Sequence, residues 1–345
     1  MMQLMKRFLM TLMALLAIGT LPALAQSEAD IKAKIKSLQP KDFPKDPLEF
    51  VVVYPAGGGM DVATRILAKY VEKWSGQKTI VTNKVGGGGM VGHTYLATQA
   101  PNDGHTIGVV ASFFWDDGWL RSERKFDYTY LEPLAFINYD PTTWIVRTDG
   151  PLKDNTLKDI VGLIKEKSGE LKVGVVPMTS NEFIAEQMEA LSNGGKITKV
   201  PFQGGAPSIT ALLGGHVDIS FGYLAEYRGH LEAGKVKIIG QANTERVPSL
   251  KDVPTFNEAL GVNDMVWLAW RYAAVPRGTP ADRKAYLEAA LNAALNDPEI
   301  VPEYAKTGST MDTKRMNSAK AVTDEVNKLA KLEYDFFIKT GRIKK

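Results

Sequence analysis

Two glycine-rich turns are the parts of this sequence with the clearest capacity for chemistry. The first spans residues 54–61, Tyr-Pro-Ala-Gly-Gly-Gly-Met-Asp, and ends an apolar run of strand length at 50–54. The second is the run of four glycines at 86–89, after a strand-like run at 79–82. Both open onto helical patterns, and the first turn of a helix presents unpaired N–H groups at the positive end of its dipole. The sequence therefore predicts anion binding at these helix starts, where glycine allows close approach to the backbone.

The same residues also have a purely structural interpretation. In it, the glycines only reverse the chain, and Asp61 caps the helix that follows. Asp61 and Asp218 are the acid pair that could suggest catalysis, but we interpret Asp218 as a strand-end residue that holds backbone near the domain junction. The second glycine turn repeats the same order of strand, glycine turn and helix start. This repetition favours the anion-binding interpretation.

Residues for other kinds of chemistry are scarce. There is no cysteine, and the four histidines (His93, His105, His216 and His230) have no metal-binding spacing, so we predict no metal site and expect each histidine at the surface. The sequence contains no Walker motif, no nucleophile elbow and no dinucleotide fingerprint. We therefore predict that the protein needs no cofactor and is not an enzyme.

Composition places the chain among globular proteins that do not bind nucleic acid. The 345 residues are 44% hydrophobic and 23% charged, which is enough for two cores of moderate size. The formal net charge is only +3 at pH 7. A net charge this close to zero does not indicate the positively charged surface that nucleic-acid binding needs.

The N-terminus has the three parts of a secretory signal peptide. Lys6 and Arg7 precede an apolar run at 8–18, and Ala23-Leu24-Ala25 is a small-x-small cleavage site. We predict that residues 1–25 are removed and that the protein is periplasmic, without a lipid anchor because no cysteine is present. The intact mass of the exported protein should match a chain starting at Gln26; a mass that still includes Lys6 and Arg7 would contradict this.

The remainder of the chain alternates strands with helices, which predicts an α/β fold with parallel sheets whose glycine turns share one edge. We expect strands at 50–54, 79–82, 106–111, 171–176, 199–202, 217–221, 236–241 and 267–275. We expect helices at 62–75, 90–99, 182–191, 208–213, 281–296 and 319–337, and a surface helix within 28–45.

The alternation divides the chain into two lobes. Residues 112–150 interrupt the alternation of strands and helices, and we predict that this section is irregular. We therefore expect the chain to cross from one lobe to the other there, and again after residue 235. The predicted first lobe comprises residues 26–138 and 267–345, and the second comprises 139–266. On this division the two long helices that close the chain return to the first lobe.

Four stretches carry a resemblance to a known family. Residues 54–61 match an aromatic-Pro-Pro-Gly-Gly-x-x-Asp motif, and 81–92 match a Glu-Asn-Arg-x-Gly-x-Gly-Gly turn. The stretch 200–218 follows the family closely, and 246–258 contains its Leu-x-Asp-Val-Pro-Thr pattern. With these motifs the chain resembles the substrate-binding proteins of tripartite tricarboxylate transporters, also called the Bug or citrate-binding receptor family, over nearly all of the mature sequence.

The resemblance implies a two-lobed periplasmic binding protein of type II-like fold, with a ligand cleft between the lobes. It implies a monomeric receptor that closes on a small organic carboxylate and delivers it to the membrane permease subunits of a tripartite transporter. Both glycine turns fall where the family holds a ligand carboxylate, so backbone N–H groups would hold it without an arginine. The candidate ligand-binding residues are Tyr54, Ala56, Gly57, Gly58, Met60, Asp61, Gly88, Gly89 and Met90 on the first wall, and Thr179, Ser180, Asn181, Gln203, Gly204, Gly205, Ala206 and Tyr223 on the second.

The loop after the strand at 106–111 departs from the family. It reads Ser112-Phe113-Phe114-Trp115, where many relatives have a small polar loop. We add Ser112, Phe113 and Phe114 to the candidates as a flat apolar wall for the ligand, with core packing as the alternative. The second wall departs too, with Thr179 where the family usually has glycine.

Two functions from other classes stay open at this point. One is an exported hydrolase or isomerase that acts on a carboxylate, and the other is a sensor that presents its ligand to a signalling partner. Turnover of a bound acid would favour the enzyme. The sequence does not name the acid.

Overall fold

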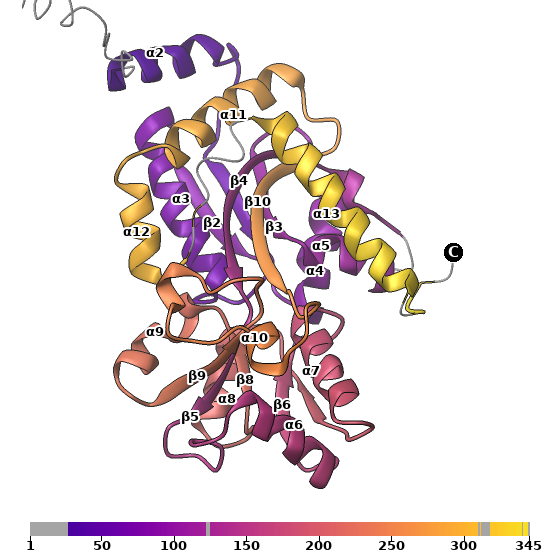
Figure 1. The fold of residues 1–345 in the computed structure, drawn as a ribbon. Coiled ribbons are helices and arrows are strands. Elements are labelled where there is room, and N and C mark those ends of the chain that lie inside the picture. The colour runs from indigo at the N-terminus through magenta and orange to yellow at the C-terminus, as the bar shows by residue number, and fades with distance from the viewer. Residues whose placement is uncertain (1–26, 122–124, 310, 312–317, 340, 344–345) are drawn as a thin grey trace, which may run out of the picture.

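The computed structural model describes residues 27–121, 125–309, 311, 318–339 and 341–343, so the predicted signal peptide lies outside the described residues. The first lobe is built on a five-stranded sheet of order β2-β1-β3-β10-β4 (Figure 1). Its strands are β1 (Leu48–Val52), β2 (Thr79–Asn83), β3 (Thr106–Ala111), β4 (Leu131–Pro141) and β10 (Leu268–Pro276). β1 pairs in parallel with β2 and β3, whereas β10 is antiparallel to β3 and β4.

The second lobe contains two smaller sheets, of order β8-β5-β9 and β6-β7. The strands are β5 (Thr143–Arg147), β6 (Lys172–Val175), β7 (Thr198–Pro201), β8 (Ser220–Gly222) and β9 (Val236–Gln241). β6 and β7 are parallel, but β5 is antiparallel to both of its neighbours. The prediction of parallel sheets therefore holds for β1, β2, β3, β6 and β7 and is wrong for the others.

The section at 112–150 that we predicted to be irregular contains the two strands β4 and β5. Most of β4 is buried, so its sequence lacks the alternation of apolar and polar residues that marks a half-exposed strand. Pro133, Asn138 and Asp140 interrupt its apolar run further. The prediction failed because burial, and not local pattern, decides the conformation of this strand.

Helices cover both lobes (Figure 1). Those packed in the first lobe are α2 (Glu28–Leu38), α3 (Gly59–Ser75), α4 (Met90–Thr98), α5 (Phe113–Asp116), α11 (Ala281–Leu295), α12 (Ile300–Thr307) and the first part of α13 (Ala319–Lys339). Those of the second lobe are α6 (Leu157–Glu166), α7 (Ser180–Leu191), α8 (Gly205–Leu213), α9 (Leu224–Glu232) and α10 (Phe256–Leu260).

The chain crosses between the lobes at two adjacent backbone segments. Thr142, between β4 and β5, donates its N–H to the carbonyl of Trp267 at 3.0 Å. Its own carbonyl accepts the N–H of Ala242 at 2.8 Å. The crossings thus lie side by side.

The last helix, α13, belongs to both lobes. Val322 and Val326 are buried in the core of the first lobe, whereas Phe337 is buried in the core of the second. The Phe337 ring lies 5.4 Å from that of Phe183, edge to face. The end of α13 therefore packs outside the first lobe, in which we expected the whole helix, because Phe337 is buried against Phe183 of the second lobe.

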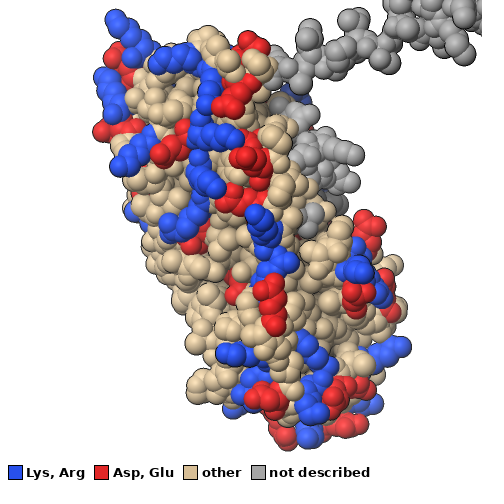
Figure 2. Space-filling model, turned by 90° about the vertical axis from the view of Figure 1, so that its left-hand side faces the viewer, with Lys and Arg blue, Asp and Glu red and all other residues tan. Residues whose placement is uncertain are grey.

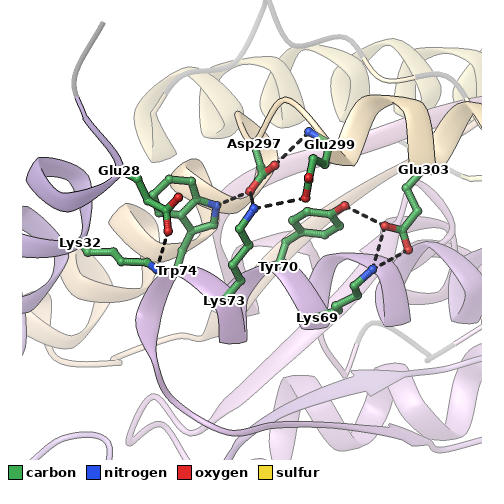
Figure 3. Close-up of polar contacts among 9 residues, drawn as sticks. All are labelled: Glu28, Lys32, Lys69, Tyr70, Lys73, Trp74, Asp297, Glu299 and Glu303. Atoms are coloured by element: carbon green, nitrogen blue, oxygen red, sulfur yellow. Dashed lines mark hydrogen bonds and ion pairs between the residues drawn. The ribbon is translucent and has the colours of Figure 1, made fainter.

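A polar network fixes α3, the helix that begins at the first glycine turn (Figure 3). Asp297 pairs with Lys73 at 2.7 Å and accepts a hydrogen bond from Trp74 Nε1 at 2.9 Å. Burial opposes ionisation of Asp297, but these partners outweigh it and lower its pKa. Tyr70 donates to Glu303 on α12 at 2.7 Å. These contacts hold the helix body, so the position of its N-terminus is defined as well.

Charges of both signs share the molecular surface. On the face drawn in Figure 2, Lys and Arg side chains are interspersed with Asp and Glu, and neither sign dominates. Ion pairs such as Lys69 with Glu303, 3.0 Å apart, also bring the two signs together. Among the described residues, no helix is both long and apolar enough to span a bilayer.

Candidate functional site

A small cavity of about 30 Å³ lies between the two lobes, at the carboxyl ends of β1 and β3. β1 is the central strand of the parallel group, with β2 on one side and β3 on the other. Ligands of open α/β sheets usually bind at the carboxyl ends of the strands where the strand order changes direction in this way. The predicted residues that line the cavity are Tyr54, Gly58, Met60, Thr179, Asn181, Gly204, Gly205, Ala206 and Tyr223. Lining residues that we did not predict include Pro55, Gly59, Ala111, Val176, Phe221, Glu226, Ala269 and Arg271.

The first glycine turn forms one wall of this cavity. α3 begins at Gly59, three residues before the predicted start, with Gly58 as an extended N-cap residue at φ −73°. The N–H of Gly59 points across the cavity and donates to Glu226 Oε1 at 3.0 Å. The structure thus places a backbone donor and a carboxylate together at the predicted anion position.

Asp61 secures this turn and does not line the cavity. Its carboxylate accepts hydrogen bonds from the Gly57 N–H at 2.9 Å, from Asn83 Nδ2 at 3.0 Å and from Arg65 Nε at 3.0 Å. Burial opposes its ionisation, but these bonds prevail and lower its pKa. The helix-capping interpretation describes Asp61, and we withdraw it from the ligand-binding candidates. Ala56 and Gly57 are exposed and also lie outside the lining.

The second glycine turn lies at the contact between the lobes and not on the cavity wall. Gly88 and Gly89 have φ values of 63° and 105°, which side chains rarely adopt. The Gly88 N–H donates to Gln203 Oε1 of the second lobe at 2.7 Å. A Cβ on Gly89 would lie 3.1 Å from the Tyr54 hydroxyl, so Tyr54 packs against this turn. Gly88, Gly89, Met90 and Gln203 therefore lie outside the lining of the cavity.

The turns before α7 and α8 form the opposite wall. Thr179 Oγ1 donates to the Val176 carbonyl at 2.7 Å, and Asn181 Nδ2 donates to Thr179 Oγ1 at 3.2 Å. Asn181 Oδ1 is buried and has no hydrogen-bond partner among the described residues. Ser180 lies outside the lining, 3.4 Å from Thr142 Oγ1. Asn181 therefore offers the cavity a polar atom that a ligand could satisfy.

Arg271 is the cation of this cavity, and our expectation of a site without arginine is incomplete. The side chain comes from β10, is 1% exposed, and its Nη1 donates to Asp140 on β4. Its guanidinium carbon lies 5.0 Å from the centre of the Tyr223 ring. Burial opposes its charge, but Asp140 outweighs this and raises the pKa of Arg271. A lone arginine in the apolar run Leu268–Pro276 was the sequence signal for it.

Glu226 is the second unpredicted group. Its Oε2 accepts the N–H of Tyr223 at 2.9 Å, in addition to the bond from Gly59 to Oε1. Burial raises the pKa of Glu226, although the two backbone N–H groups and Arg271 act in the opposite direction. In the sequence, Glu226 is an ordinary acidic residue in the first turn of a helix. Only the packing of the two lobes shows that Glu226 lines the cavity.

The aromatic loop after β3 belongs to the core. Phe114 is fully buried and stacks on Phe126 at 5.3 Å, and Trp115 lies 5.0 Å from Trp270. Ser112 Oγ donates to the carbonyl of Leu268 at 3.5 Å, behind the lining. The core alternative describes Phe114 and Trp115, since α5 folds down onto the buried sheet and not toward the cavity. The Phe113 side chain lies outside the described part of the chain.

His93 also corrects an expectation. We expected every histidine at the surface, yet His93 is fully buried and pairs with Asp117 at 2.6 Å. His216 is exposed, as expected.

Asp218 accepts the N–H of Lys172 at 2.8 Å, so its side chain holds the backbone, as we predicted.

Comparison with known proteins identifies the family. The model of the tripartite tricarboxylate transporter family receptor matches residues 63–334. The chain belongs to this receptor family. The resemblance drawn from the sequence motifs is thereby confirmed.

Relatives and solved structures agree with this membership. A UPF0065 protein in the tcbD-tcbE intergenic region of Pseudomonas sp. (strain P51) is 29% identical over 272 residues, which cover 77% of this chain and 79% of that protein. The structure of the periplasmic binding protein BugD is 28% identical, with a TM-score of 0.79, and covers 88% of this chain and 100% of BugD. MatC (Rpa3494) from Rhodopseudomonas palustris, solved with bound malate, is 26% identical with a TM-score of 0.77, covering 85% of this chain and 99% of MatC. The two-lobed α/β binding-protein fold is confirmed, and this receptor's family is one of periplasmic solute-binding proteins.

Proposed function

We propose that this receptor captures a small organic carboxylate in the cavity between its lobes and passes it to the permease subunits of a tripartite transporter. The observation that carries the proposal is the Gly59 N–H, the first donor of α3, which already holds a carboxylate oxygen at 3.0 Å. The buried Arg271 adds a positive charge to the same cavity. MatC, a relative with the same fold, was solved with the dicarboxylate malate.

The geometry favours binding over turnover. Among the described lining residues there is no histidine, and the nearby hydroxyls of Ser180 and Thr142 contact each other at 3.4 Å and not a base. A nucleophile needs a base within hydrogen-bond reach. We therefore propose a receptor without enzymatic activity, periplasmic and monomeric, released from the membrane by loss of residues 1–25 and carrying no lipid.

Ligand exchange requires the lobes to separate. Among the described residues, the hydrogen bonds that join the lobes include those from Gly59 to Glu226 and from Gly88 to Gln203. We propose that they belong to a closed form, and that an open form arises by rotation about the crossings at Thr142 and Trp267. In this proposal the first crossing is at the end of β4, four residues after the predicted boundary at 138, because Asn138 pairs with Arg271 in the first sheet. Small-angle scattering should show a smaller radius of gyration at saturating ligand, and an unchanged radius would contradict closure.

Calorimetric titration of matched acids and amides tests the proposed function. Malate, citrate, adipate and benzoate sample the acid classes, and the corresponding amides keep each skeleton but remove its negative charge. We expect at least one acid to bind, and its amide to bind about 100-fold more weakly, because each lost charge-assisted hydrogen bond is worth about 1.5–3 kcal/mol. Equal affinity for acid and amide would show that the cavity does not recognise a carboxylate.

A further inference from the structure

A carboxylate of the second lobe already occupies the helix start that forms the anion site. Glu226 accepts hydrogen bonds from the N–H groups of Gly59, at 3.0 Å, and of Tyr223, at 2.9 Å. A Cβ on Gly205 would lie 2.2 Å from Glu226 Oε2, so the same carboxylate lies against the first residue of α8. Glu226 therefore stands between the first turns of α3 and α8, which belong to opposite lobes.

Among the described residues, the titratable groups that face Glu226 come from three elements. Arg271 on β10 is the cation, and Asp140 on β4 is its ion-pair partner. Tyr223 and Tyr227 stand at the start of α9 and are the neighbouring phenols. Within the part of the chain that the structure describes, the Arg271 guanidinium thus faces two carboxylates before any ligand enters.

A ligand carboxylate brings a third negative charge to this place. When two carboxylates share a site, the pKa of one of them rises strongly. Glu226 is the group that can respond, because burial already raises its pKa, against the Tyr223 and Gly59 N–H groups and Arg271. Asp61, in the first turn of α3, is held ionised by its own hydrogen bonds, which lower its pKa.

We propose that the receptor binds its carboxylate ligand together with one proton, which Glu226 takes up from solvent and shares with the ligand. The inference rests on the proposed function and adds to it a dependence on pH. The protonated Glu226 then donates its O–H to the ligand carboxylate, while the Gly59 N–H is released to donate to the ligand as well. The two acid groups together carry one negative charge opposite Arg271.

The direction of the pH dependence follows from this linkage. Ligand binding raises the pKa of Glu226, so affinity is highest where Glu226 is protonated before the ligand arrives. As pH rises through the pKa of Glu226 in the free receptor, affinity falls by up to about tenfold per pH unit, until the pKa in the complex is passed. A Glu226→Gln variant keeps the shape of the side chain but has no such dependence.

Calorimetry in buffers of different ionisation enthalpy measures proton uptake directly. We expect malate, or the panel acid of highest affinity, to bind the wild type with uptake of up to one proton per ligand between about pH 6 and pH 8, where free carboxylic acids are ionised. Glu226→Gln should bind the same acid without uptake and with affinity independent of pH. Glu258→Gln is the matched control, because Glu258 occupies the same third position of a helix, α10, and lies outside the cavity lining. It should keep the wild-type uptake.

Two results would overturn the inference. One is the absence of proton uptake by the wild type at every pH tested, which needs no variant and so does not depend on the folding of Glu226→Gln. The other is equal uptake by the wild type and a Glu226→Gln variant that thermal unfolding shows to be folded. If no acid of the panel binds the wild type, the proposed function itself is wrong and this inference falls with it, a result distinct from binding without protons.

Discussion

Replacing Gly58 by valine is expected to abolish carboxylate binding while the protein stays folded. Gly58 has φ −73° and ψ 161°, a conformation that valine adopts readily. Its added Cβ would lie 3.4 Å from Glu226 Oε1, at the anion position, and 3.1 Å from the Pro55 carbonyl, a contact that a small shift relieves. The branched side chain would displace the ligand carboxylate from the start of α3. The ligand carboxylate would lose its charge-assisted hydrogen bonds from the Gly59 N–H and from Glu226. Loss of these two bonds corresponds to about 3–6 kcal/mol, or roughly 10²–10⁴-fold in affinity by calorimetry.

Gly162→Val provides the matched control for this prediction. Gly162 lies in α6 of the second lobe, where a Cβ would meet no atom within 4 Å. This variant should bind like the wild type, because it leaves the cavity unchanged. If Gly58→Val remains folded and keeps wild-type affinity, the start of α3 is not the ligand site.

Replacing Arg271 by methionine is expected to lower the free energy of unfolding by about 3–5 kcal/mol, because it removes the buried guanidinium that pairs with the buried carboxylate of Asp140. Asp140 is 3% exposed and also accepts hydrogen bonds from Asn138 Nδ2, at 3.1 Å, and Ser309 Oγ, at 3.4 Å, which do not replace the ion pair with Arg271. Denaturant unfolding measures the effect. Ligand affinity should fall too, since Arg271 is the cation of the cavity.

Two further variants separate the buried charge from the loss of a side chain. Adding Asp140→Asn to Arg271→Met should recover part of the lost stability, because it removes the buried negative charge that Arg271 balanced. Lys331→Met breaks an exposed pair with Asp335, whose side chains are 74% and 57% exposed, and should cost no more than about 0.5 kcal/mol. A loss for Arg271→Met as small as that for Lys331→Met would mean that the buried pair contributes little.

The local signals of the first lobe were sufficient to predict its parallel strands. β1, β2 and β3 lie within one or two residues of the predicted ranges, because each apolar run is short and ends in a glycine turn or a polar turn. The glycine turn at 57–59 likewise revealed the start of α3. In these segments the sequence neighbours are also the structural neighbours, so pattern and propensity determine the result.

The parts that were missed depend on contacts between distant segments. β4 is buried among neighbours that the chain reaches only much later, so no local alternation marks it. Glu226 and Arg271 meet at the cavity although they are far apart in sequence and lie in different lobes. The aromatic cluster at Phe114 and Trp115 has the composition of a ligand wall or of a core, and only the direction in which α5 packs decides between them.

The position of the ligand carboxylate is tested most directly by a crystal structure of the receptor with the panel acid that binds most tightly. We predict a carboxylate oxygen within hydrogen-bond distance of the Gly59 N–H, with a Glu226 oxygen beside it close enough to share a proton. The ligand should touch Arg271 or Asn181 with its remaining polar groups. A ligand bound outside this cavity, with the Glu226 carboxylate still alone on Gly59, would contradict this assignment.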